Sequence, residues 1–281
     1  MVEERVAVVT GAAHGIGRRT AEVLAAEGYL LAVIDREPVA DFDGPASAGG
    51  VLASAGDVLA SAGDVLASAG DVLAFAGDVS DESDVLRFVA EVEARYGRAD
   101  VLVNNAGIAS IAPAEETTAA QWRQVIDVNL TGPFLLCQAF GRRMLARGAG
   151  SIVNIASVAG LMGVADRVAY NASKHGLIGL TRTLAVEWGG RGVRVNAVCP
   201  GWVKTEMDDA SQASGAYVDT DITEHVPMAR FAQPDDIAKA VSFLADPAKS
   251  GFVNGAALSV DGGWAADGSW QSLRLASRAR P

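Results

Sequence analysis

Three side chains in the second half of the chain could together move a proton. Tyr170 and Lys174 stand four residues apart at the start of a helical segment, so phenol and ammonium lie one turn apart on one face. A neighbouring cation stabilises a phenolate and lowers the phenol pKa from its usual value of about 10. Ser157 ends a predicted strand, and its hydroxyl can hydrogen-bond a substrate oxygen while Tyr170 exchanges the proton. These residues predict acid–base chemistry on an alcohol or a carbonyl group.

The histidines and cysteines do not have the spacing of metal ligands. His14, His175 and His225 are scattered along the chain, and no Cys/His cluster occurs. Cys137 and Cys199 each lie inside an apolar stretch, which indicates reduced cysteines packed in a core. We therefore expect no metal and a reducing compartment.

A glycine-rich loop lies between the first predicted strand and the helix that follows. Its glycines allow a tight turn and let the backbone approach a pyrophosphate, which would sit against the free N–H groups at the helix N-terminus. This position, at the start of a β-α-β unit, is the context that such a motif needs. The loop therefore predicts a dinucleotide site built from Gly11, His14, Gly15, Ile16 and Gly17.

An acidic residue at the end of the second strand bears on the choice of dinucleotide. Asp35 follows Gly17 by 18 residues, where a carboxylate can accept hydrogen bonds from an adenosine ribose. A 2′-phosphate would bring like charge next to Asp35, so the sequence favours NAD over NADP. His14 and Arg36 are nearby and could partly compensate, which leaves NADP open. Asp78 and Val79, after the third strand, could contact the adenine.

The elements that must position these residues are read from the apolar pattern. Short runs rich in Val and Ile alternate with longer segments of helical period, which predicts a parallel sheet with helices on both faces. Right-handed crossovers then give a doubly wound α/β sheet, in which ligands bind at the carboxyl ends of the strands. The seven predicted strands are 6–10, 30–35, 72–76, 101–107, 151–157, 193–198 and 257–260. The predicted helices are 15–27, 81–96, 118–147, 168–190 and 234–245.

A repeat interrupts this alternation. VLASAGD occurs at 51–57, 58–64 and 65–71 and again as VLAFAGD at 72–78, after a partial copy at 46–50. Each copy resembles a short strand followed by a turn, and only one copy can occupy the third strand's place. We expect the last copy there, because it leads directly to Ser80, which could cap the next helix. The earlier copies would form a flexible insertion of low order over 46–71, with slippage of the register as a second possibility.

The composition of the chain disfavours some classes of binding partner. The 281 residues carry a formal net charge of −11, which disfavours binding to nucleic acid or to an anionic membrane surface. The N-terminus has no basic or cleavable apolar segment, and no apolar run reaches the roughly 18 residues of a membrane span. We expect a cytoplasmic protein whose partner is a small molecule.

Taken together, these motifs resemble those of the short-chain dehydrogenase/reductase family, from about residue 5 to residue 263. The glycine motif of the family matches Thr10, Gly11, Gly15 and Gly17, and its Asn-Asn-Ala-Gly element matches the run that ends in Asn105, Ala106 and Gly107. Its active-site Asn, Ser and Tyr-x-x-x-Lys match Asn129, Ser157, Tyr170 and Lys174. The repeat departs from the family pattern, because it replaces an expected helix after the second strand.

The resemblance implies a Rossmann-like fold and a role for each matched residue. Tyr170 would be the acid/base, Ser157 would polarise the carbonyl, Lys174 would bind the nicotinamide ribose, and Asn129 would hold a water of the proton relay. Pro200, Gly201, Val203 and Thr205 match the segment that lies beside the nicotinamide. The resemblance also suggests a homo-tetramer, which fits the broad apolar faces of the helices at 118–147 and 168–190. One catalytic domain, 1–263, would precede a C-terminal extension, 264–281.

The substrate is less well defined by the sequence. Its contacts should come from the segments after Gly107, from 158–164 and from a 202–225 loop that could close over the ligand, with Trp202, Met207 and Tyr217. These mostly apolar segments favour a neutral ketone or secondary alcohol, whereas three polar side chains would suit a sugar-like substrate, namely Asp208, Asp209 and His225. We predict an NAD-dependent alcohol dehydrogenase or ketone reductase. The alternatives are an NADP-dependent carbonyl reductase and a non-catalytic NAD-binding sensor or scaffold.

Overall fold

The computed structural model describes residues 4–39, 65–67, 72–205 and 218–269, the three residues 65–67 as backbone alone. The expected low order of 46–71 therefore lies outside the described residues, apart from 65–67, and so do Met207, Asp208, Asp209 and Tyr217. No helix in the described ranges is long and apolar enough to cross a membrane.

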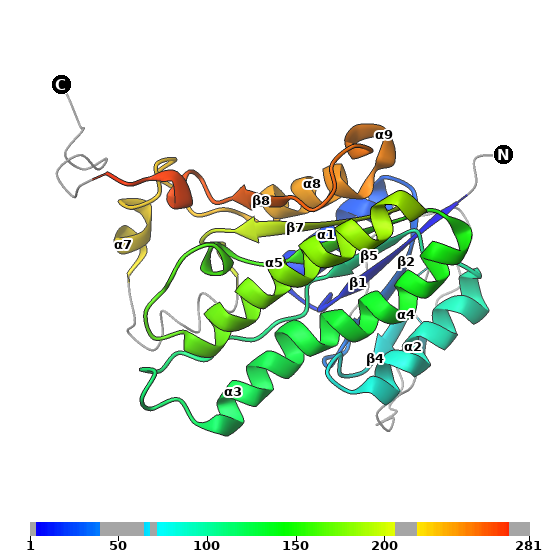
Figure 1. Cartoon of the computed structure of the whole chain (residues 1–281), viewed down its shortest axis with the longest axis horizontal. Helices are drawn as coiled ribbons and strands as arrows, with labels where there is room; N and C mark the ends of the chain where they lie inside the picture. Colours follow the sequence, from blue (N-terminus) through cyan, green and yellow to red (C-terminus); the bar gives the residue numbers. More distant parts are fainter. Residues whose placement is uncertain (1–3, 40–64, 68–71, 206–217, 270–281) are drawn as a thin grey trace.

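A doubly wound sheet forms the centre of the molecule (Figure 1). Its order is β3-β4-β2-β1-β5-β6-β7-β8, so the chain runs outward in one direction from β1 and in the other from β5. All the predicted strands are present and pair in parallel: β1 Arg5–Thr10, β2 Tyr29–Asp35, β4 Val72–Ala76, β5 Val101–Asn104, β6 Gly150–Ile155, β7 Val193–Pro200 and β8 Ala257–Val260. The prediction of a seven-stranded parallel sheet is confirmed.

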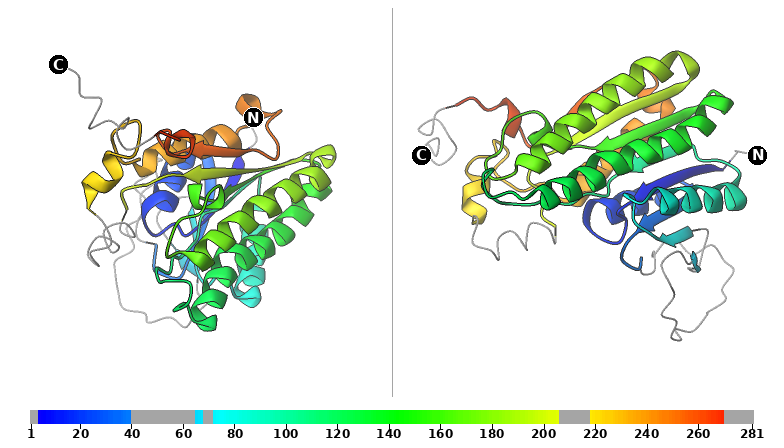
Figure 2. Two further views of the ribbon diagram at one scale, coloured as in Figure 1. Left: turned by 60° about the vertical axis from the view of Figure 1, so that its left-hand side comes forward. Right: turned by 60° about the horizontal axis from the view of Figure 1, so that its bottom comes forward.

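Helices cover both faces of this sheet (Figure 2). The five predicted helical segments are present, and two short helices, α7 and α9, were not predicted. The predicted segment 118–147 is divided by a π-turn at Asp127–Thr131. The bounds are α1 Gly15–Ala26, α2 Glu82–Tyr96, α3 Ala119–Ile126, α4 Gly132–Arg147, α5 Val168–Trp188, α7 Asp219–Thr223, α8 Pro234–Ala245 and α9 Pro247–Ser250.

Local hydrogen bonds fix where α2 begins. The Asp81 side chain accepts from the backbone N–H groups of Ser83 and Asp84, which satisfies two donors of the first turn. Ser80, which we expected to be the cap, instead donates its hydroxyl to Asp78 at 2.6 Å. The expectation was wrong because Asp81 stands one residue closer to the helix, where its carboxylate reaches the free N–H groups.

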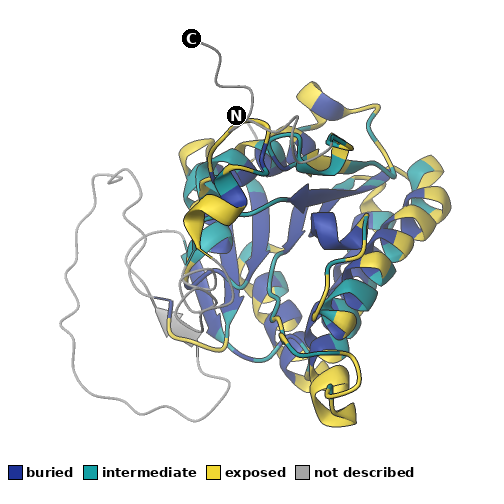
Figure 3. Cartoon of the chain, turned by 90° about the vertical axis from the view of Figure 1, so that its left-hand side faces the viewer, coloured by how far each residue is buried: buried dark blue, intermediate teal, exposed yellow. Residues whose placement is uncertain are grey.

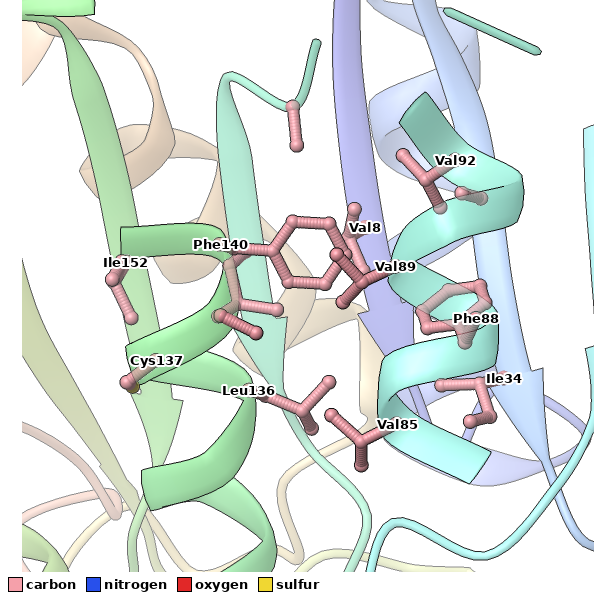
Figure 4. Close-up of a cluster of buried hydrophobic side chains, with 14 of the residues drawn as sticks. Val8, Ile34, Val85, Phe88, Val89, Val92, Leu136, Cys137, Phe140 and Ile152 are labelled. Carbon is pink, nitrogen blue, oxygen red and sulfur yellow. The ribbon is translucent and has the colours of Figure 1, made fainter. Parts of the chain in front are cut away.

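Alternation along each strand supplies the two cores. In β1, Val8 faces the core under α2 and α4, whereas Ala7 and Val9 face the core under α1 and α8. Figure 4 shows the first of these cores, in which Phe88 from α2 and Phe140 from α4 lie over the strands. Their rings are 6.1 Å apart and nearly edge-on, which is a favoured aromatic geometry.

One aromatic side chain selects which repeat copy enters the sheet. Phe75 occurs only in the last copy, since the first three copies have Ser at the same place. It is 2% exposed, and its ring lies 5.5 Å from that of Phe88. A serine there would bury a hydroxyl and leave a cavity against α2. The last copy therefore forms β4, as expected, and the core resists slippage to an earlier copy.

The third copy adds a strand that the sequence did not predict. β3, Val65–Ala67, pairs antiparallel with β4, with Val65 opposite Phe75 and Ala67 opposite Leu73. It forms the edge of an eight-stranded sheet and covers the backbone groups that β4 would otherwise expose. Two copies of the repeat thus have a place in the sheet.

The first two full copies should be dispensable. Deleting residues 51–64 leaves one VLASAGD copy and the VLAFAGD copy, which are the sequences of β3 and β4. We expect the free energy of unfolding in urea to change by less than about 1 kcal/mol, because loop-closure entropy varies only with the logarithm of length. Cofactor affinity should stay within about twofold.

The matched comparison is Phe75→Ser, which replaces one side chain in β4 and leaves the chain length unchanged. It should lower the free energy of unfolding by about 3–5 kcal/mol, since it removes a buried ring. A deletion variant that is as destabilised as Phe75→Ser, or that fails to bind cofactor, would show that the early copies are part of the fold.

Candidate active site

The cleft that holds the predicted site lies at the carboxyl ends of the strands, where the order of successive strands changes direction between β1 and β5. Figure 3 looks onto this end of the molecule, and the strands there are buried between the helix layers. The cleft has a volume of about 820 Å³. This is large enough for a dinucleotide fragment together with a small substrate.

A clasp of hydrogen bonds joins the two strands that diverge below the cleft. The Thr10 hydroxyl accepts from the backbone N–H groups of Asn105 and Ala106, at 3.0 and 2.9 Å. In return, the Asn105 side chain donates to the carbonyls of Thr10 and Gly11, at 3.0 and 2.9 Å. The glycine loop and the segment after β5 are thereby fixed to each other.

The clasp leaves no room for larger residues at two glycines. Gly11 has φ +66°, and a Cβ atom there would lie 2.8 Å from the Ala106 Cα. A Cβ on Gly17 would lie 2.0 Å from the Gly11 carbonyl oxygen. Gly11 lines the cleft, whereas Gly17 lies outside its lining and allows α1 to start close under the loop. Glycine is therefore required at both positions for steric reasons.

Acidic side chains surround the end of the cleft near β2. Asp35 accepts from the backbone N–H groups of Ala13 and Glu37, at 2.9 and 3.1 Å. The His14 ring lies 2.9 Å from a Glu37 carboxylate oxygen. Glu37 lines the cleft and was missed from sequence, although it stands only two residues after Asp35.

The second basic group at this end is also paired. The Arg36 guanidinium lies 3.7 Å from the Asp78 carboxylate. Asp78 and Val79, for which the sequence suggested contact with an adenine, line the cleft beside Arg36. The end of the cleft near β2 therefore holds three carboxylates against one arginine and one histidine.

Ser157, Tyr170 and Lys174 come together in the wall at the other end of the cleft. α5 carries both Tyr170 and Lys174, and the Lys174 ammonium lies 5.5 Å from the centre of the Tyr170 ring. This ammonium is buried and donates to the Ile155 carbonyl at 2.8 Å. Loss of hydration on burial lowers the pKa of Lys174 to about 8.

The Tyr170 phenol is subject to opposing effects. Burial raises its pKa, because the phenolate would lose hydration, whereas the Ser157 hydroxyl and the charge of Arg167 lower it. The Ser157 hydroxyl oxygen accepts from the Ala159 backbone N–H at 3.1 Å. Its own O–H can therefore donate towards a substrate oxygen.

Asn129 lies next to this group but does not line the cleft. It is fully buried in the π-turn between α3 and α4. Its side-chain oxygen accepts from the Ile108 N–H at 2.8 Å, and its amide donates to the Ile108 carbonyl at 2.9 Å and to the Ser173 hydroxyl at 3.1 Å. The Asn129 side chain thus fixes the segment after β5 against α5.

The remaining predicted cofactor residues also lie in the cleft wall. Gly107 is close to both Asn129 and Lys174, since a Cβ on it would lie 3.3 Å and 3.5 Å from their polar atoms. The others line the cleft along its length: Gly15, Ile16, Asn105, Ala106, Pro200, Gly201, Val203 and Thr205. Within the described ranges, no group of three or more His, Cys, Asp or Glu side chains could hold a metal ion.

Aromatic rings close the cleft beyond Tyr170. Trp202 lies 5.9 Å from Trp264 between ring centres, and His225 stacks on Trp264 at 4.8 Å. Both tryptophans line the cleft. Trp264 was assigned from sequence to the C-terminal extension, but it begins a 3-10 turn that packs on this wall. The place of Trp264 depends on its contact with Trp202, which is distant in sequence, so no local pattern indicates it.

Burial of Lys174 predicts how stability depends on pH. Its pKa of about 8 in the folded chain lies below the ordinary lysine value of about 10.4, so the unfolded chain binds more protons between these values. The cost of burying the charge is therefore present below pH 8 and is lost as the pH rises. Relative to Lys174→Met, the wild-type chain should gain about 2 kcal/mol of stability between pH 8 and 9.5. Urea unfolding of both chains over this pH range measures the difference in their free energies of unfolding. A difference that does not change with pH would contradict the prediction.

Comparison with known proteins places this geometry in a family. The family model described as enoyl-(acyl carrier protein) reductase matches residues 11–265. The D-threitol dehydrogenase of Mycolicibacterium smegmatis is 43% identical over 263 residues, covering 94% of each chain. The L-tagatose-forming galactitol 2-dehydrogenase of Cereibacter sphaeroides is 43% identical over 92% of this chain and 94% of its own.

A solved structure extends the likeness to three dimensions. A candidate NAD(P)-dependent gluconate 5-dehydrogenase from Beutenbergia cavernae, with bound NADP, is similar with a TM-score of 0.79 and 38% identity. The similarity covers 95% of this chain and 98% of that one. The glycine loop, the Tyr-Lys pair on α5 and these matches agree, and the chain belongs to the short-chain dehydrogenase/reductase family of nicotinamide-dependent oxidoreductases.

Proposed function

We propose that this enzyme uses NAD to oxidise a secondary hydroxyl of a polyhydroxylated small molecule, or catalyses the reverse reduction, with Tyr170 as the acid/base. The observation that carries the proposal is that Ser157, Tyr170 and Lys174 share one cleft with the glycine loop and Asp35. A reacting carbon beside Tyr170 would then be within reach of a nicotinamide whose adenosine lies at β2.

The residues present fit a dinucleotide. The first turn of α1 has no acidic residue, and its N-cap residue, His14, makes no capping hydrogen bond through its side chain. The N–H groups of that turn therefore remain available to a pyrophosphate. Gly11 and Gly15 line the cleft beside this turn without a side chain that would block the approach of a pyrophosphate. Asp35 would hold the adenosine ribose, and Lys174 the ribose beside the nicotinamide.

Charge at the end near β2 supports NAD rather than NADP. His14 and Arg36, which could have offset a 2′-phosphate, already face Glu37 and Asp78. Glu37 adds a second carboxylate next to Asp35, so a phosphate there would meet net negative charge. NADP remains the alternative, since the related gluconate 5-dehydrogenase structure has NADP bound.

The bound nicotinamide supplies the group that accepts or returns a hydride at the substrate carbon. Tyr170 takes the hydroxyl proton during oxidation and returns it during reduction. Ser157 donates its O–H to the substrate oxygen while its own oxygen accepts from the Ala159 N–H. Lys174 lies beside the Tyr170 ring, and its positive charge favours the phenolate.

The main role of Asn129 in this mechanism is to hold neighbouring segments in place. Its side chain is engaged by Ile108 and Ser173, so the relay water proposed for it would use the acceptor capacity that remains. It also keeps Gly107 and Ile108 next to Lys174. A proton leaving Tyr170 would then pass towards Lys174 and solvent along this wall.

The proposed substrate class rests on the relatives and on the cleft wall. The relatives named for threitol and galactitol act on polyols. In this chain the wall beyond Tyr170 combines the rings of Trp202 and Trp264 with the charge of Arg167. Such a wall suits a carbon chain that carries several oxygen atoms.

A tetramer and a cytoplasmic location belong to the same proposal. Large apolar side chains are exposed on three neighbouring helices, namely Trp122 on α3, Phe134 on α4 and Val168 and Val186 on α5. A second copy of the chain could cover them. Both cysteines, Cys137 and Cys199, are free and buried, which suits a reducing compartment.

Cofactor choice can be tested by removing the two carboxylates near β2. The wild-type chain should use NAD with a higher kcat/KM than NADP. Asp35→Asn with Glu37→Gln should shift the ratio towards NADP by about tenfold, because each unit charge about 6 Å from a phosphate charge contributes roughly 0.7 kcal/mol in water. Glu91→Gln, an exposed change on α2, is the matched control. A wild-type preference for NADP would overturn the NAD assignment.

Tyr170→Phe separates an enzyme from a non-catalytic NAD-binding protein. The variant keeps the ring that packs beside Lys174 and loses only the hydroxyl. We expect turnover of a polyol panel to fall by about 10³-fold or more, while NAD binding measured by fluorescence titration stays within about threefold. A wild-type chain that binds NAD but turns over none of the panel would favour the sensor or scaffold.

A further inference from the structure

Arg167 differs from the other cations that line the cleft. Its side chain has no carboxylate within ion-pair distance among the described residues, and its one hydrogen bond, to the Ala165 carbonyl, is long at 3.5 Å. The other cations each have a closer polar partner: His14 with Glu37, Arg36 with Asp78, and Lys174 with the Ile155 carbonyl. Arg167 is therefore the cation with the most unused hydrogen-bonding capacity in this part of the cleft.

The neighbours of Arg167 place it at the substrate end. It precedes Tyr170 by three residues at the start of α5, and its charge acts on the Tyr170 phenol. Its guanidinium lies 5.5 Å from the centre of the Trp202 ring. Its backbone pairs with Ala112, in the segment that follows Gly107. None of these contacts is with the glycine loop or with the acidic end near β2.

The backbone around Arg167 is firmly held. The Ala112 N–H donates to the Asp166 carbonyl at 2.9 Å, and the Asn171 N–H donates to the Arg167 carbonyl at 2.8 Å. Asp166 has φ +58°, a strained value for a residue with a side chain, and strain of this kind is concentrated at functional sites. A guanidinium placed over a ring, as Arg167 is over Trp202, can still donate from the N–H groups at its edge.

We propose that Arg167 binds a carboxylate of the substrate at the Tyr170 end of the cleft. The inference rests on the proposed function and narrows its substrate class from polyols in general to hydroxy acids, such as sugar acids. A carboxylate suits one guanidinium, which offers two parallel N–H donors to its two oxygens. A phosphate would call for further cations, and Lys174 is already bound to Ile155.

Paired substrates test this directly. Gluconate and glucitol, or galactonate and galactitol, differ at one end in having a carboxylate or a neutral hydroxymethyl group. The wild-type chain should have the higher kcat/KM for the acid of each pair. Arg167→Gln should lower the ratio of acid to alditol by about tenfold or more, mainly through KM, and Arg167→Lys should restore part of it.

The control is Arg191→Gln, which removes an exposed arginine before β7, at the opposite end of the sheet. It should leave the ratio unchanged. An Arg167→Gln chain that loses the same factor on both substrates, with its pH profile moved to higher pH, would show that Arg167 acts only through the Tyr170 pKa. That result, or a wild-type preference for the alditol, overturns the proposal.

A binding measurement keeps the two proposals distinguishable. In a Tyr170→Phe chain with NAD, quenching of tryptophan fluorescence by gluconate and by glucitol reports affinity without turnover. Acid binding that is lost with Arg167→Gln would support the carboxylate site even if no substrate is turned over by the wild-type chain. Equal affinity for acid and alditol would reject the carboxylate site while leaving the oxidoreductase function untouched.

Discussion

The clasp between Thr10 and Asn105 is the interaction on which the site depends. Successive strands are added on one side of β1 and on the other side of β5, so the two halves of the cleft are built on strands whose connections lead away from each other. The end of the cleft near β2 is built on the strands beside β1, and the end that holds Tyr170 is built on the strands beside β5. Four hydrogen bonds, all between side chain and backbone, hold these halves in one register. They also bring Asn105 and Ala106 so close to the glycine loop that a Cβ on Gly11 would lie 2.8 Å from the Ala106 Cα.

A second constraint is the price of placing Lys174 where it is. Its ammonium is buried, its one hydrogen-bond partner among the described residues is the Ile155 carbonyl, and the lowered pKa of Lys174 reflects the cost of that burial. Asn129 fixes Ile108, which lines the same cleft as Lys174. The π-turn that holds Asn129 breaks an otherwise continuous helix, and such turns are frequent at functional sites. The fold thus gives up some stability where the chemistry takes place.

The sequence predicted what depends on local pattern and missed what depends on contact between distant segments. All seven parallel strands follow from runs of Val and Ile, and the i, i+4 spacing of Tyr170 and Lys174 is enough to place both on one face. Trp264 and β3 could not be found this way, because Trp264 is aligned by Trp202 and β3 by pairing with β4. Arg167 could have been found, since it stands one helical turn before Tyr170.

The repeat offers the chain a way to change length without changing shape. Between β2 and β3 the connection has 29 residues, from 36 to 64, and removing two copies would leave 15. By the logarithmic dependence of loop closure on length, this alters the free energy of folding by only about 0.6 kcal/mol. Since Phe75 alone marks the copy that enters the core, copies can be gained or lost in units of seven almost neutrally. A gain or loss of one seven-residue copy would therefore change the length of this connection and leave the core around Phe75 as it is.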